Sequence, residues 1–84
     1  MDEKILIVIT TFRSDNDRDL RRECLGPYDR QTAPAKLEGL FALCRKEGMK
    51  SLKGFKAIRR GVCLHKPGTR LCVEIRVDSF VPSH

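Results

Sequence analysis

The stretch Lys4–Phe12, KILIVITTF, decides which folds this chain of 84 residues can adopt. Five consecutive aliphatic residues, from Ile5 to Ile9, are followed by two threonines and Phe12. Such β-branched and aromatic residues favour a strand, and an apolar run without polar interruption is typical of a strand covered on both faces. The sequence therefore predicts a central β-strand here. The run is far too short to span a bilayer.

The polar residues after this strand predict a short surface helix over about residues 15–25. Ser14 is a suitable N-cap, and three aspartates follow near the positive start of such a helix. Arg21 and Arg22 stand near its end, where Gly26-Pro27 would stop it. Because few of its residues are apolar, we expect only a narrow buried stripe.

A second helix is predicted from Thr32 or Ala33, with Pro34 in its first turn, to Gly48. Its apolar residues are spaced at i, i+3, i+4 and i+7: Leu37, Leu40, Phe41 and Cys44. This spacing places them on one face of a helix, which we expect to pack against the sheet.

The segment 51–61, SLKGFKAIRRG, admits two interpretations. Apolar residues recur at every third position, with lysines on another side, which favours a short amphipathic helix with a basic face. Against this, Gly54 lies in the middle and costs a helix roughly 1 kcal/mol relative to alanine. The alternative is a long strand that begins at Phe55.

The stretch Gly61–Ile75, GVCLHKPGTRLCVEI, predicts a β-hairpin. Lys66-Pro67-Gly68-Thr69 has the composition of a type II turn, in which Gly68 supplies the positive φ. Counting these four residues as the loop places His65 opposite Arg70 and Cys63 opposite Cys72. Alternation along the strands then gives an apolar face with Leu64, Val73 and Ile75. The other face carries the two cysteines, His65 and Glu74.

Together these elements predict one α+β domain over residues 1–84. It consists of a small antiparallel sheet, made of the N-terminal strand and the C-terminal hairpin, packed against two or three helices. The order of helix, turn, basic helix and hairpin over Ala33–Val77 resembles the winged helix-turn-helix family. This resemblance implies DNA binding. The N-terminal strand departs from the family pattern, and the basic segment holds no Asn or Gln that could read a base.

The residues that could bind metal are poorly spaced for it. Cys63, Cys72 and His65 provide three ligand types on one face, but zinc needs a fourth ligand and usually a close pair in sequence. The aspartates at positions 15–19 begin like a calcium loop, but Leu20 stands where glycine is required. We expect no metal or other cofactor. The chain lacks the basic start of a signal peptide, so we expect a cytoplasmic protein whose four cysteines stay reduced.

The sequence contains no catalytic motif, and neither histidine is placed to activate a cysteine. We therefore expect a binding protein rather than an enzyme. The net charge is +6, and the whole excess lies between Arg45 and Arg70, where nine basic residues accompany one acidic residue. Such segregation suits a polyanion or an acidic protein surface. The predicted contact residues are Lys46, Lys50, Lys53, Lys56, Arg59, Arg60, Lys66 and Arg70.

Two functions follow from this charge pattern. In the first, the protein is a small nucleic-acid-binding protein with a regulatory or accessory role, and it contacts backbone phosphates. In the second, it is a small adaptor or inhibitor, of the kind that mobile elements encode, and its basic surface binds a host protein such as nucleic-acid-processing machinery. No membrane partner is expected.

Overall fold

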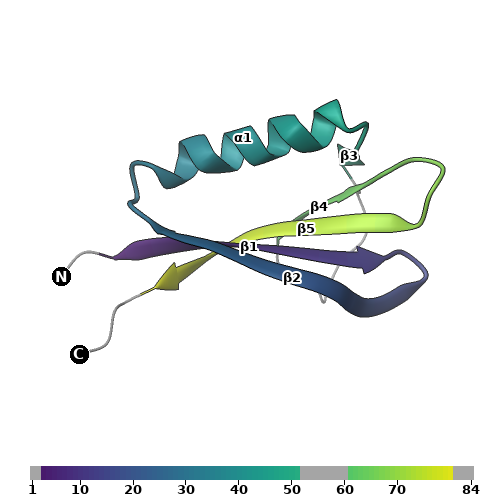
Figure 1. Ribbon diagram of the computed structural model, residues 1–84, viewed down its shortest axis with the longest axis horizontal. Coiled ribbons are helices and arrows are strands. Elements are labelled where there is room, and N and C mark those ends of the chain that lie inside the picture. Colours follow the sequence, from purple (N-terminus) through teal and green to yellow (C-terminus); the bar gives the residue numbers. More distant parts are fainter. Residues whose placement is uncertain (1–2, 52–60, 81–84) are drawn as a thin grey trace.

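The computed structural model describes residues 3–51 and 61–80. They form a five-stranded antiparallel sheet with one helix on one of its faces (Figure 1). The elements along the chain are β1 (Lys4–Arg13), β2 (Asn16–Tyr28), α1 (Ala33–Lys46), β3 (Lys50–Ser51), β4 (Val62–His65) and β5 (Leu71–Phe80). The strand order is β2-β1-β5-β4-β3. No helix among the described residues is long and apolar enough to cross a membrane.

The strand predicted over residues 4–12 is confirmed as β1, which lies inside the sheet between β2 and β5. Ile7 is completely buried and its neighbour Val8 is 5% exposed, so consecutive side chains on opposite faces are both covered. β5, rather than β1, is the middle strand. Each such buried aliphatic side chain contributes about 1.5–3 kcal/mol to folding.

The predicted helix over residues 15–25 is wrong, because these residues belong to strand β2. β2 pairs with β1 from Asn16 to Tyr28, with Leu25 opposite Ile7 and Arg21 opposite Thr11. β1 needs a neighbour for the backbone groups on its outer side, and this need outweighs weak local helix signals. The charged residues of this segment, on which the helix prediction depended, are equally typical of an exposed edge strand.

The prediction of two or three helices is therefore wrong as well, since the described residues contain one helix on a mostly antiparallel sheet. The winged-helix arrangement is overturned with it, because the described residues form a five-stranded antiparallel sheet in which β2 and β1 pair beside the hairpin, with a single helix on that sheet. The basic helix or strand considered for residues 52–60 lies outside the described part of the chain. Helix α1 itself is confirmed, and the turn after it is closed by a bond from the Gly48 amide to the Arg45 carbonyl (2.9 Å).

The hairpin of β4 and β5 is confirmed, but its register differs from the prediction by two residues. Cys63 lies opposite Glu74, and His65 lies opposite Cys72. The predicted turn does form, with Gly68 at φ 82° and the Thr69 amide bonded to the Lys66 carbonyl (3.1 Å). The Lys66 amide also bonds to the Leu71 carbonyl (3.1 Å), which moves the loop one residue along the chain. A shift of two residues leaves every side chain on its predicted face.

The core has two parts, one on each face of the sheet. Under α1, Ile7, Met49, Leu64 and Ile75 form a buried cluster against the apolar face of the helix. On the opposite face, Phe12, Cys63 and Cys72 form a second buried cluster. Cys63 and Cys72 are thus buried in this cluster as small apolar residues, whereas Cys24 on β2 is exposed.

Candidate nucleic-acid interface

Four parts of the fold meet at one end of the sheet, which we call the turn end (Figure 1). They are the β1–β2 turn, the β4–β5 turn, the C-terminal end of α1 and the beginning of β3. The strand register fixes this arrangement, because Arg13 at the end of β1 lies opposite Leu71, and Lys50 of β3 lies opposite His65. The Ser14 amide also donates to the Arg70 carbonyl (2.9 Å), which joins the two turns.

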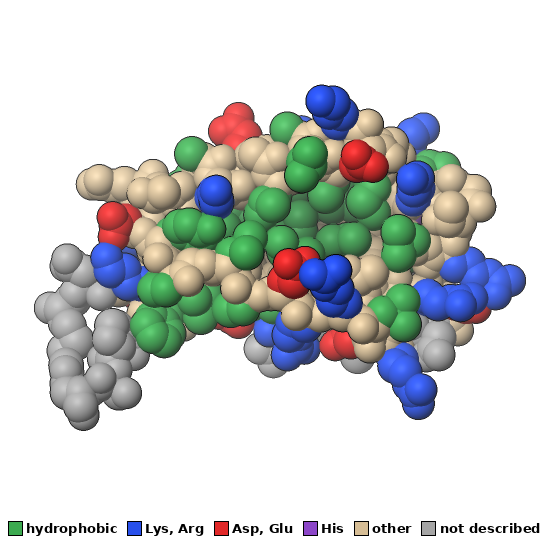
Figure 2. Space-filling view, viewed as in Figure 1, with side chains coloured by type: hydrophobic (Ala, Val, Ile, Leu, Met, Phe, Trp, Pro, Cys, Tyr) green, Lys and Arg blue, Asp and Glu red, His purple; other side chains and the backbone are tan. Residues whose placement is uncertain are grey.

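The turn end is strongly basic. Figure 2 shows Lys and Arg side chains projecting from this end of the molecule. The acidic residues at this end include Asp15 and Glu47. The basic residues at the turn end are Arg13, Arg45, Lys46, Lys50, Lys66 and Arg70.

The structure brings together the four predicted contact residues that it describes: Lys46, Lys50, Lys66 and Arg70 all lie at the turn end. The three lysines are exposed, and none of them has an ion-pair partner among the described residues. β1 and β3 are separated by three interstrand spacings. The basic residues at this end of the sheet therefore extend over about 14 Å across the strands. The other predicted contacts, Lys53, Lys56, Arg59 and Arg60, lie outside the described residues.

Arg70 differs from these lysines because an acidic side chain binds it. Its Nη1 donates to Oδ2 of Asp15 at 2.7 Å. Arg13 also binds Asp15, with Nε to Oδ1 and Nη2 to Oδ2 both at 3.2 Å. Desolvation raises the pKa of Asp15, but the hydrogen bonds from Arg13 and Arg70 and the charge of Arg13 lower it below its ordinary value. The positive charge of Arg70 is thus partly neutralised.

Sequence reasoning missed Arg13 and Asp15 as parts of this surface. The sequence pattern places Asp15 at a helix start, and Arg13 lies outside the basic stretch. One signal was available, since Ser, Asp and Asn at positions 14–16 are typical turn residues directly after a strand. The contact with Arg70 joins residues 55 positions apart, and no local pattern indicates it.

The structure describes no grouping suited to metal or covalent chemistry. Within residues 3–51 and 61–80, no three His, Cys, Asp or Glu side chains lie together in a way that could hold a metal ion. The observed register places Glu74 opposite Cys63, so the two hairpin thiols do not face each other directly. None of the four cysteines, which all lie in the described part of the chain, forms a disulfide bond. Burial raises the pKa of the Cys44 thiol, which makes it a poorer nucleophile.

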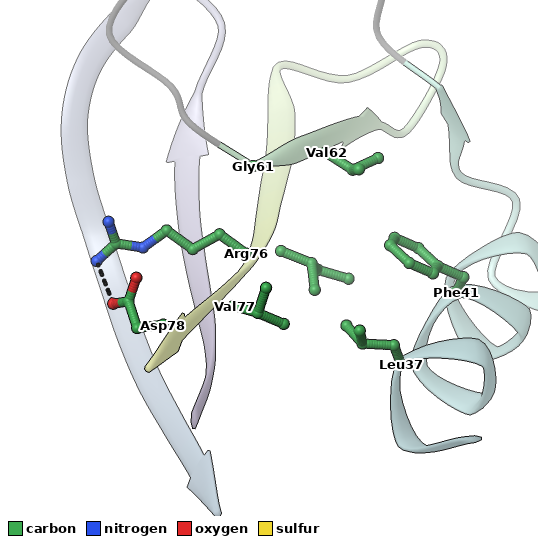
Figure 3. A pocket seen from close by; sticks show the side chains of 8 residues that line it. Leu37, Phe41, Gly61, Val62, Arg76, Val77 and Asp78 are labelled. Carbon is green, nitrogen blue, oxygen red and sulfur yellow. Dashed lines mark ion pairs between the residues drawn. The ribbon is translucent and has the colours of Figure 1, made fainter. Parts of the chain in front are cut away.

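A second surface feature is an apolar groove of about 550 Å³ between α1 and the β4–β5 strands. In Figure 3, Leu37 and Phe41 point from the helix towards Val62 and Val77 on the strands. Val62 and Val77 are each about half exposed. The groove could therefore accept apolar side chains of a protein partner.

No protein-family model, curated protein or solved structure matches the chain. The geometry of the turn end and of the groove is therefore the basis for a functional assignment.

Proposed function

We propose that this protein binds nucleic acid through contacts between its turn end and backbone phosphates, in a regulatory or accessory rather than a catalytic role. The observation that supports this most directly is the group of three exposed lysines, Lys46, Lys50 and Lys66, without acidic partners among the described residues. Lysines in this state attract polyanions and release counterions when phosphate binds. We place this role in the cytoplasm, where cysteines that form no disulfide, as here, stay reduced.

The fold favours contact with the backbone over the reading of bases. The helix of the described part, α1, packs one side on the sheet, and its exposed residues are one acidic residue, Glu38, together with scattered basic and apolar residues. It therefore lacks the basic face of a recognition helix that enters the major groove. Phosphate contacts alone position a protein without selecting a sequence. The proposal therefore predicts similar affinities for unrelated nucleic-acid sequences.

The test reverses the charge of Lys46, Lys50 and Lys66 to glutamate and measures the affinity for a labelled oligonucleotide over a range of salt concentrations. If the three lysines each meet one phosphate of a duplex, the slope of log affinity against log salt should become smaller by about 2.7. The matched control reverses three exposed basic residues that lie outside the turn end, Arg22, Arg30 and Lys36. It changes the net charge equally.

The expected result is a large loss of affinity in the turn-end variant and a clearly smaller loss in the control. Thermal midpoints should differ little, because exposed charges contribute little to stability. Equal losses in the two variants would show that net charge, and not the turn end, attracts the nucleic acid. Absence of binding by the unmodified protein would refute the proposal.

The second candidate is a small adaptor or inhibitor that binds a protein with an acidic surface. The apolar groove beside Phe41 and Val77 favours it, because protein interfaces combine apolar pockets with charged rims. Pull-down of the tagged protein with and without nuclease separates the two candidates. A partner protein retained after nuclease treatment, and lost on Val77→Glu, would favour the adaptor. The loss of all partners with nuclease would favour nucleic-acid binding.

A further inference from the structure

A hollow of about 340 Å³ lies at the turn end between the two hairpins. Two arginines, one threonine and two leucines line it: Arg13, Arg70, Thr69, Leu20 and Leu71. Both leucines are unusually exposed for a large apolar residue: Leu20 is 56% exposed and Leu71 is 39% exposed. The hollow thus offers both strong cationic donors and apolar surface within a few residues.

Both guanidinium groups are bound by the same carboxylate. Asp15 accepts one N–H bond from Arg70 at 2.7 Å and two from Arg13 at 3.2 Å. Two arginines converging on one anion is the arrangement that recognises phosphate, because the planar guanidinium forks match its oxygens as well as those of a carboxylate. Asp15 therefore stands where a phosphate oxygen pair would be bound.

The Asp15 contact is of a kind that a competing anion can replace. The carboxylate lies on an exposed turn, with its side chain 39% exposed, and exposed ion pairs are weak. The turn keeps its place without this contact, since the Ser14 amide bonds to the Arg70 carbonyl. The Thr69 hydroxyl already makes two hydrogen bonds within the protein, because it donates to the Lys66 carbonyl (2.7 Å) and accepts from the Leu71 amide (3.1 Å). The arginines are thus the groups that can change partner.

We propose that the hollow is a subsite for one nucleotide of the bound strand, whose phosphodiester replaces Asp15 on Arg13 and Arg70. The attached sugar or base then lies on Leu20 and Leu71, where apolar contact adds to the charge interaction. The subsite rests on the proposed nucleic-acid function and makes Asp15 an internal competitor that lowers the affinity of the free protein.

The test compares Asp15→Asn with Asp29→Asn in binding a single-stranded 12-mer. The second variant is the matched control, because it removes the same charge from the opposite end of the sheet, where Asp29 pairs with Lys4. Asparagine keeps a hydrogen-bond acceptor, so both variants should fold, and circular dichroism checks this. We expect Asp15→Asn to bind about three- to tenfold more tightly than Asp29→Asn. This range corresponds to the free energy of the exposed ion pairs that no longer have to be broken when the oligonucleotide binds. Leu71→Ser should weaken binding in the Asp15→Asn background.

The outcomes separate this inference from the function on which it rests. If the protein binds the 12-mer but the two Asp→Asn variants have equal affinities, the subsite is wrong and phosphate binding by the lysines stands. If Leu71→Ser has no effect while Asp15→Asn binds more tightly, the apolar part of the subsite is wrong. If neither the unmodified protein nor Asp15→Asn binds, both proposals fail.

Discussion

Replacing Gly61 with alanine should disrupt the point where the chain enters β4. A Cβ atom at Gly61 would lie 2.4 Å from the Ile75 carbonyl oxygen and 2.7 Å from the Arg76 Cβ. Both neighbours are held firmly, because β5 pairs with β1 along its whole length. The alanine can therefore be accommodated only if the start of β4 moves away from β5.

The cost has two parts. Forcing a methyl group into such a packed position typically destabilises a protein by about 1–3 kcal/mol. The movement would also break the bond from the Gly61 amide to Oε2 of Glu74, which is 2.9 Å long and involves a side chain only 5% exposed. A hydrogen bond to a charged group contributes about 1.5–3 kcal/mol. We expect a loss of about 3 kcal/mol or more, a large part of the roughly 4–12 kcal/mol typical for a domain of this size.

Urea unfolding followed by circular dichroism measures this loss. Gly39→Ala provides the matched control, because Gly39 lies within α1 and a Cβ there would meet no atom within 4 Å. In that position alanine should stabilise the helix by up to about 1 kcal/mol. The same substitution should thus have opposite effects at the two sites. A Gly61→Ala protein whose unfolding free energy lies within about 0.5 kcal/mol of the original would refute the close approach of β4 to β5.

Three further predictions test other parts of the structure. Phe12→Ala should destabilise the protein by about 3–5 kcal/mol in urea unfolding, because Phe12 is completely buried; a loss under 1 kcal/mol would contradict the second core cluster. Alkylation, followed by mass spectrometry, should modify the exposed Cys24 first, then Cys44, whose pKa is raised by burial, and the buried Cys72 last. Early modification of Cys72 would show that the structure around this residue opens readily. Because the pKa of Asp15 is lowered in the fold, its stabilising contact is complete above its unfolded pKa of about 3.9 and is lost as the pH falls through the folded value. The difference in urea midpoint between Asp15→Asn and the original protein should therefore be present at pH 7 and should shrink as the pH falls below about 3.9.

The basic surface was predictable only in part. A count of charges along the chain located Lys46, Lys50 and Lys66, and the fold places all three at the turn end. The same count treated Arg70 as equivalent to them, because it could not show that the Asp15 carboxylate lies 2.7 Å away. Which charges face solvent alone and which are paired depends on contacts between distant segments.

The sequence by itself determined those elements whose signal is local. The apolar run of Lys4–Arg13 makes β1, the i, i+3, i+4 and i+7 spacing makes α1, and Pro67-Gly68 makes the turn. Alternation along a strand also fixed which hairpin residues share a face. In each case the physical cause, which is side-chain periodicity or backbone φ preference, acts over a few neighbouring residues.

Only the tertiary structure decided that residues 16–28 form a strand and how the hairpin is aligned. The conformation of β2 is set by the unpaired backbone groups of β1, and a polar segment with weak preferences of its own adopts whatever conformation satisfies them. The hairpin register similarly depends on the Ser14–Arg70 bond between two separate turns. These interactions join groups far apart in the chain, so the free energy that selects them is not contained in any short stretch of sequence.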